Sequence, residues 1–229
     1  MKKIKPFLFI LVILILSVAL LAVSFVMPKE DVLAKSNAMD DIAKLITEEK
    51  YDKAIQKIDA YEGKYGTDDL SFYNRAVALD YLGKTSEAEG YLEKCSNNFR
   101  DNNADWYFAK GEISLNENNT PYAVQMYQKA LEINPNHYES LFRLGWYSLY
   151  NDTDCFKAIY YLRSAVNIRD TDAVTLFLLG KAYLNIAEYN EAKYWIDRAC
   201  LLSDNGAVIE GAKECYEVIN EHETKGGLR

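Results

Sequence analysis

Histidine and cysteine are scarce in this chain of 229 residues, and neither is arranged as in metal sites or redox motifs. The two histidines, His137 and His222, have no partners at ligand spacing, and the four cysteines are widely spaced with no CxxC pair. The sequence also lacks the G-x-S-x-G, H-E-x-x-H, phosphate-binding glycine-loop and kinase signatures. We therefore predict that the protein is not an enzyme and that it binds no metal and no cofactor.

Basic residues are too few to balance the acidic ones. The whole chain has 26 Lys and Arg against 34 Asp and Glu, a net charge of −8, and residues 32–229 alone reach −10. Such a charge opposes binding to nucleic acid and flat attachment to an anionic lipid surface, because both partners are polyanions. The sequence thus predicts no nucleic-acid partner.

One long hydrophobic run lies near the N-terminus. Residues 7–27 carry no charge, and these 21 residues of helix would span about 30 Å, the thickness of a bilayer's hydrocarbon core. Three lysines precede the run, so the N-terminus is expected in the cytoplasm and the rest of the chain outside it. We predict a transmembrane signal anchor over residues 1–28 and a linker over 29–34, which makes a single-pass membrane protein with an extracytoplasmic main domain.

Two other topologies remain open at this point. Ala22 and Ser24 form an acceptable small-residue cleavage site, so the run can be a signal peptide whose removal secretes the rest of the chain. In the other alternative, the run anchors the protein on an organelle surface and leaves the remaining residues in the cytosol.

The rest of the sequence repeats with a period of 34 or 35 residues. Each copy has an alanine at the same place, a large apolar residue four positions later and, in most copies, a small residue twelve positions earlier. Small and large residues at fixed places let two helices approach closely and fill the space beside them. In the fourth copy the small residue, Gly145, lies one position too far from the alanine, which predicts a one-residue insertion in the turn. The five alanines are Ala54, Ala88, Ala123, Ala158 and Ala192.

This pattern resembles the tetratricopeptide repeat family, whose motif includes a glycine, an Ala-x3-aromatic group and a late proline. The copy from Trp106 to Pro135 matches best, with Gly111, Ala123 and Tyr127 in place. The resemblance covers residues 35–206 and implies an all-α, right-handed α-solenoid of about five helix–turn–helix units. The implied units are 35–68, 69–103, 104–137, 138–172 and 173–206, followed by a capping helix at 207–223 and a flexible tail at 224–229.

The cysteines fit this framework in two ways. Cys200 and Cys215 are expected on neighbouring helices, so they can form a disulfide in an oxidising compartment. In the alternative interpretation all four cysteines are buried thiols, and Cys95 takes the place of a small core residue between helices.

The resemblance also implies a binding surface, because the first helix of each pair lines the concave face in this family. That face would be rich in aromatic side chains, which offer large contact areas at low entropic cost. Arg143 and Lys181 would bind a carboxylate and Asn74 a peptide backbone; alternatively, the aromatic rings only stack on the next repeat. The predicted groove residues are Tyr73, Asn74, Tyr81, Phe108, Phe142, Arg143, Trp146, Tyr150, Phe177 and Lys181.

From these features we predict a membrane-anchored scaffold or adaptor that binds a protein or an extended peptide in its concave groove. The resemblance places such proteins in secretion or in assembly of the bacterial envelope. Two other functions remain open: a chaperone-like holdase for exported chains, and a structural oligomeriser whose groove holds another copy's tail. The oligomeric state itself is left open.

Overall fold

The computed structural model describes residues 29–203 and 206–226, and all the regular structure in these ranges is helical. The predicted span at residues 7–27 lies outside the described residues, and no helix in the described part is long and apolar enough to cross a membrane. The helices of the described part are α2 (Lys29–Thr47), α3 (Tyr51–Tyr65), α4 (Asp69–Tyr81), α5 (Thr85–Leu92), α6 (Asn97–Asp101), α7 (Ala104–Asn116), α8 (Thr120–Ile133), α9 (Tyr138–Tyr150), α10 (Cys155–Ile168), α11 (Ala173–Asn185), α12 (Tyr189–Leu202) and α13 (Gly206–Gly226).

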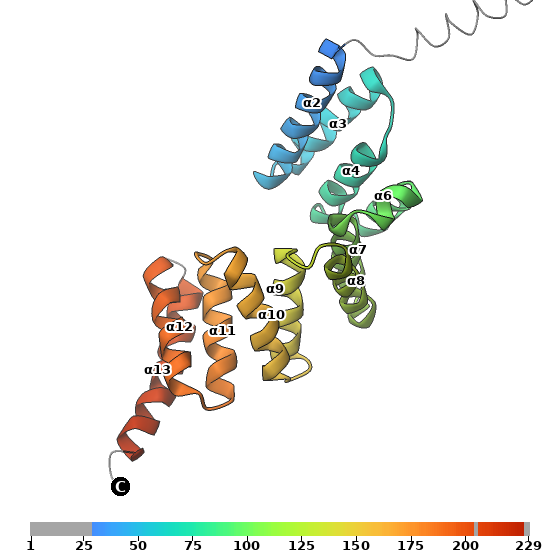
Figure 1. Ribbon diagram of the computed structural model, residues 1–229. Helices are drawn as coiled ribbons and strands as arrows, with labels where there is room; N and C mark the ends of the chain where they lie inside the picture. The colour runs from blue at the N-terminus through green and yellow to red at the C-terminus, as the bar shows by residue number, and fades with distance from the viewer. Residues whose placement is uncertain (1–28, 204–205, 227–229) are drawn as a thin grey trace, which may run out of the picture.

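The helices form an all-α solenoid of stacked antiparallel pairs (Figure 1). The pairs are α2 with α3, α4 with α5, α7 with α8, α9 with α10 and α11 with α12, and α13 closes the stack against α11 and α12. We call α2, α4, α7, α9 and α11 the first helices. Figure 1 shows α2–α5 and α9–α13 meeting at an angle, with α7 at the corner.

Three details differ from the sequence-based expectation. Residues 29–34, predicted as a linker, are the start of α2, and residues 224–226, predicted as tail, continue α13. The short helix α6 was not predicted. It forms because the Ser96 hydroxyl accepts the backbone N–H of Phe99 as an N-cap, while Asp69 binds the Ser96 backbone N–H and hydroxyl at 2.6 and 2.7 Å.

Close helix contact explains the repeated small residues. All five repeat alanines are completely buried. A Cβ atom added to Gly111 would lie 2.5 Å from the ring of Tyr127, and one added to Gly180 would lie 2.6 Å from Ile196. In the pairs α7–α8, α9–α10 and α11–α12, a glycine on the first helix therefore meets a large side chain on the second, whereas α2 carries the buried Ile42 at this place.

The turns inside the helix pairs repeat as regularly as the alanines. Each contains one residue in the left-handed region, always five positions before the repeat alanine: Glu49, Gly83, Asn118, Thr153 and Ala187. The turn between α9 and α10 has four residues and the other four turns have three, which confirms the insertion predicted in the fourth copy. Only one of the five left-handed residues is glycine, so the other four occupy a conformation that L-residues disfavour.

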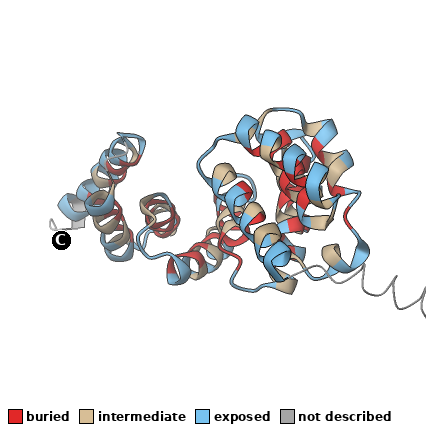
Figure 2. Cartoon of the chain, turned by 90° about the horizontal axis from the view of Figure 1, so that it is seen from above, coloured by how far each residue is buried: buried red, intermediate tan, exposed pale blue. Residues whose placement is uncertain are grey.

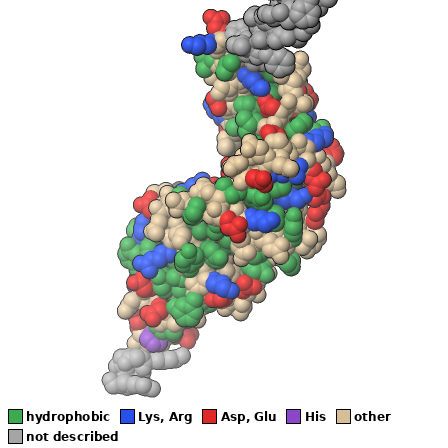
Figure 3. Space-filling view, turned by 45° about the vertical axis from the view of Figure 1, so that its right-hand side comes forward, with side chains coloured by type: hydrophobic (Ala, Val, Ile, Leu, Met, Phe, Trp, Pro, Cys, Tyr) green, Lys and Arg blue, Asp and Glu red, His purple; other side chains and the backbone are tan. Residues whose placement is uncertain are grey.

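The core is a series of linked clusters along the stack and not a single centre, as expected for a solenoid. Figure 2 shows the buried residues along the contacts between helices. The largest cluster runs through α9–α13, and another joins α4, α5 and α7. Large exposed hydrophobic side chains such as Phe156, Tyr160 and Leu201 are frequent on α9–α13, and Figure 3 shows apolar surface over that half of the molecule.

Candidate functional site: an aromatic cavity lined by three first helices

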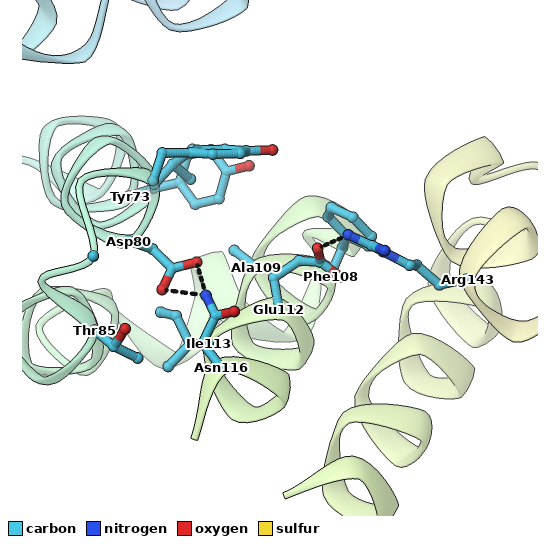
Figure 4. A pocket seen from close by; sticks show the side chains of 12 residues that line it. Tyr73, Asp80, Thr85, Phe108, Ala109, Glu112, Ile113, Asn116 and Arg143 are labelled. Carbon is cyan, nitrogen blue, oxygen red and sulfur yellow. Dashed lines mark hydrogen bonds and ion pairs between the residues drawn. The ribbon is translucent and has the colours of Figure 1, made fainter. Parts of the chain in front are cut away.

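A cavity with a volume of about 540 Å³ opens between first helices of successive pairs. It lies where α4, α7 and α9 approach one another, and the turn after α4 and the start of α5 complete its wall (Figure 4). A volume of several hundred cubic ångströms fits a drug-sized ligand or a few side chains of a partner. Its lining residues are Tyr73, Val77, Asp80, Tyr81, Gly83, Thr85, Phe108, Ala109, Glu112, Ile113, Asn116 and Arg143.

Three aromatic side chains form much of the wall. Tyr73 and Phe108 are half-buried, whereas Tyr81 at the end of α4 is 62% exposed. Tyr81 stacks on Tyr51, the first residue of α3, with ring centroids 4.8 Å apart and planes inclined by only 3°. This stacking holds the exposed ring in place without removing it from the cavity, so Tyr81 is ready to contact a ligand.

A polar group on α7 links two first helices across the cavity. The guanidinium of Arg143 on α9 forms an ion pair with Glu112 on α7, as Figure 4 shows. The hydroxyl of Tyr127 on α8 donates to the other carboxylate oxygen of Glu112. Burial, reinforced by the charge of Glu112, raises the pKa of Tyr127 and keeps this donor protonated. Arg143 was predicted to bind a ligand carboxylate, but its charge is already neutralised within the protein.

A second polar group could not be read from the sequence pattern. Asp80 on α4 and Asn116 on α7 face each other, and the Asn116 side-chain nitrogen lies 3.0 and 3.1 Å from the two Asp80 oxygens (Figure 4). Burial raises the pKa of Asp80, although its bonds with Asn116 and Thr85 oppose the shift. The two positions are 36 residues apart, close to one repeat, and that spacing is the signal that could have paired them.

A smaller cavity of about 150 Å³ continues the surface beyond Arg143, which lines both cavities. Trp146 contributes to its wall and packs against Tyr150, with ring centroids 5.3 Å apart. The ammonium of Lys181 on α11 lies 5.1 Å from the centre of the Tyr150 ring, in a cation–π contact. Five of the ten predicted groove residues therefore line these cavities: Tyr73, Tyr81, Phe108, Arg143 and Trp146. Tyr150 and Lys181 line neither cavity but adjoin the smaller one through the contact of Tyr150 with Trp146.

Three predicted groove residues lie elsewhere. Asn74 is only 8% exposed, and its amide nitrogen faces the sulfur of Met39 at 3.7 Å, so it is not free to bind a peptide backbone. Phe177 is buried in the core, where its ring occupies the space that a Cβ on Gly211 would need. Phe142 is half-buried and packs on Tyr138 and the core beside it. For these three, packing on the neighbouring helix is the role that the structure shows.

One arrangement looks like a catalytic triad but serves as a helix cap. The His137 ring lies 2.9 Å from the Ser140 hydroxyl and 3.0 Å from an Asp105 oxygen. However, Ser140 is completely buried, and His137 is the N-cap of α9, where it accepts the Ser140 backbone N–H. A hydroxyl without access cannot attack a substrate.

The described residues hold no cluster suited to a metal ion, and their four cysteines are free thiols. Burial raises the pKa of Cys95 to about 11 and also raises that of Cys215, so both remain protonated at neutral pH. The interpretation of the four cysteines as buried thiols therefore holds for Cys95 and Cys215, whereas Cys155 and Cys200 are only partly buried, and Cys200 and Cys215 are not bonded to each other here.

Comparison with known proteins identifies the fold. Residues 116–199 match the family described as anaphase-promoting complex, cyclosome, subunit 3. The solved structure of PilF from Pseudomonas aeruginosa is 14% identical in sequence. The match covers 87% of this chain and 90% of PilF, with a TM-score of 0.69. The Cut9–Hcn1 hetero-tetramer of the APC/C is 17% identical over 80% of this chain and 36% of that one, with a TM-score of 0.66.

A third solved structure is described as having a peptide site. YrrB, reported as a TPR protein with an unusual peptide-binding site, is 16% identical over 77% of this chain and 90% of its own, with a TM-score of 0.53. No curated protein matches the sequence. At these identities the structures establish a shared helical-repeat architecture and nothing finer.

Proposed function

We propose that this chain, whose fold is that of a tetratricopeptide-repeat solenoid, is a scaffold that holds a protein or peptide partner in the cavity between α4, α7 and α9. Proteins with this fold act as protein-interaction scaffolds, are typically non-enzymatic, and bind peptide or protein partners. One observation supports the site most: three successive first helices line a single cavity of about 540 Å³ with aromatic walls and an exposed, stacked Tyr81.

The aromatic wall suits a binding role. Tyrosine offers a large contact area with little rotamer entropy to lose, and it is enriched where binding energy concentrates. Tyr81 already loses freedom by stacking on Tyr51, so less entropy is lost when a partner covers it. The adjoining cavity at Trp146 would extend the contact toward α11.

Crosslinking from two exposed tyrosines, one inside the cavity and one outside it, tests this site. A photoreactive phenylalanine analogue replaces Tyr81 in the cavity or, as the control, Tyr160, which is similarly exposed on α10 but lines neither cavity. After irradiation of cells, the Tyr81 probe is expected to give a discrete adduct that the Tyr160 probe does not give. Equal adducts from both positions, or none from Tyr81, would count against the cavity as the binding site.

We further propose that residues 7–27 tether the scaffold to a membrane, with the repeats outside the cytoplasm in an envelope or secretion setting. The length of the uncharged run and the three lysines before it support this proposal. A tether raises the local concentration of the scaffold at the bilayer, so a weak groove can still capture neighbours there.

Extraction and protease protection test the tether. The full-length chain should stay in the membrane fraction after alkaline washing, whereas Leu14→Arg, which places a charge in the middle of the run, should release it or prevent insertion. Protease added outside the cytoplasmic membrane should digest the repeats. Release of the unaltered chain, or protection of the repeats, would contradict the proposal.

A further inference from the structure

The carboxylate of Asp80 lacks a cationic partner inside its cavity. Its contacts are the neutral amide of Asn116, at 3.0 and 3.1 Å, and a hydrogen bond with Thr85. Among the described residues, no lysine or arginine forms an ion pair with it, whereas Glu112 in the same cavity is paired with Arg143. With two carboxylates and one guanidinium, the lining residues leave one negative charge without a counter-charge.

The surroundings make this charge costly to keep. Burial opposes ionisation of Asp80 and raises its pKa, because water solvates the carboxylate only in part. Burial and the nearby charges of Glu112 and Asp80 also raise the pKa of Tyr81, even though Arg143 acts in the other direction. The raised pKa of Asp80 thus reflects burial, whereas that of Tyr81 reflects burial first and then the negative charges beside it.

The aromatic walls also favour a positively charged ligand. Tyr73, Tyr81 and Phe108 line the cavity, and the face of an aromatic ring carries partial negative charge. A cation held against such rings and within reach of a carboxylate gains from both interactions. An anionic ligand would meet repulsion from Asp80 and would have to displace Glu112 from Arg143.

We propose that the cavity binds a lysine or arginine side chain of the partner, with its cationic end at Asp80 and its methylene groups along Tyr73, Tyr81 and Phe108. This inference rests on the proposed scaffold function and names the chemistry of the partner segment. It reverses the prediction from sequence, which assigned Arg143 to a ligand carboxylate. The net charge of −8 on the whole chain also favours a basic partner.

A matched set of short peptides tests the charge preference. Acetyl-Gly-Gly-Xaa-Gly-Gly-amide, with Xaa as Lys, Arg, norleucine or Glu, is titrated into the full-length ¹⁵N-labelled chain in a neutral detergent. We expect the Asn116 side-chain amide and the Tyr81 backbone amide to shift with the Lys and Arg peptides, and binding of the norleucine and Glu peptides to be at least tenfold weaker. Norleucine keeps the methylene chain of lysine, so this pair isolates the charge.

Two variants distinguish the effect of the Asp80 charge from the effect of the protein's overall negative charge. Asp80→Asn keeps the shape and an acceptor for Asn116 but removes the charge, and it should weaken binding of the Lys peptide at least fivefold. Glu132→Gln removes one exposed charge from α8 and should change binding by less than twofold.

Binding of the Glu or norleucine peptide at the same residues with equal affinity, or an unchanged affinity of Asp80→Asn, would overturn the charge preference while leaving the cavity as a binding site. Absence of any shift at the cavity with every peptide would overturn the inference, and crosslinking from Tyr81 then decides the scaffold function separately.

Discussion

The side-chain amide of Asn116, the last residue of α7, spans both carboxylate oxygens of Asp80 on α4, at 3.0 and 3.1 Å. This contact joins two first helices at the wall of the cavity, and it satisfies the carboxylate without neutralising it. The negative charge of Asp80 therefore does not stabilise the fold. Removal of this charge should for that reason weaken binding without lowering the stability of the protein.

Asp80→Asn is expected to leave the thermal midpoint unchanged or to raise it at pH 7. The folded-state pKa of Asp80 is raised by burial, so the ionised form destabilises the native state above that pKa, and removal of the charge removes this cost. Thermal unfolding followed by circular dichroism measures the change. A clear fall in the midpoint would show that the carboxylate stabilises the fold.

Asp68→Asn is expected to act in the opposite direction. Burial raises the pKa of Asp68, but hydrogen bonds from Lys35 and Tyr61 outweigh it and lower the pKa overall. The stabilisation is thus present above the ordinary aspartate pKa of about 3.9 and disappears as the pH falls through the lower folded-state value. Asparagine remains an N-cap for α4, so the loss at pH 7 should be about 1 kcal/mol or less.

Acid titration of stability checks this assignment. The difference in unfolding free energy between the unaltered chain and Asp68→Asn should be constant near neutral pH and vanish as the pH falls below about 4 and through the folded-state pKa. A difference that persists at low pH would mean that the new amide side chain disturbs packing instead of removing a charge.

Gly180→Ala is expected to destabilise the solenoid by roughly 1–3 kcal/mol. The new methyl group would lie 2.6 Å from the side chain of Ile196 and 3.1 Å from the backbone oxygen of Ala192, and backbone atoms cannot move aside easily. Gly63→Ala is the matched control, because nothing lies within 4 Å of its added Cβ. In that helix interior alanine should stabilise by up to about 1 kcal/mol. Equal effects in denaturant unfolding would contradict close packing at Gly180.

The left-handed turn residues predict a pair of changes with opposite signs. Ala187→Gly should stabilise by about 0.5–1 kcal/mol, because alanine at φ 63° occupies a conformation that glycine adopts without strain. Gly83→Ala, at φ 75° in the equivalent turn, should destabilise by a similar amount. The measurement is denaturant unfolding of both variants. Changes of the same sign in both would show that the turns do not share one conformation.

The architecture could be predicted because its cause is local and repeated. A methyl group at Ala158 or a missing one at Gly145 decides how closely two helices approach, and the same demand recurs in every copy. The insertion before Asp154 was detectable for the same reason, since it moves Gly145 one position farther from Ala158 than the small residue lies from the alanine in the other copies. The extra helix α6 was not, because Ser96 caps it with help from Asp69 in a different helix.

The site could be predicted only in part because its polar contacts join different repeats. Glu112 and Arg143 are 31 residues apart, which is about one repeat less one helical turn, and Asp80 and Asn116 are 36 apart. These offsets depend on how neighbouring first helices are rotated against each other. A single helix does not specify that rotation, so Arg143 was assigned to a ligand. The buried position of Asn74 has the same origin, since Met39 on the preceding first helix covers it.

The central claim is that the partner binds in the cavity and not on the outer face, and two exposed tyrosines offer the most direct test. The partner segment captured by the Tyr81 probe is synthesised as a peptide, and its dissociation constant is measured for the full-length chain, Tyr81→Ala and Tyr160→Ala. We predict at least a tenfold loss for Tyr81→Ala, which corresponds to about 1.4 kcal/mol, and a change within about twofold for Tyr160→Ala. Equal losses for the two variants, or a larger loss for Tyr160→Ala, would contradict the claim.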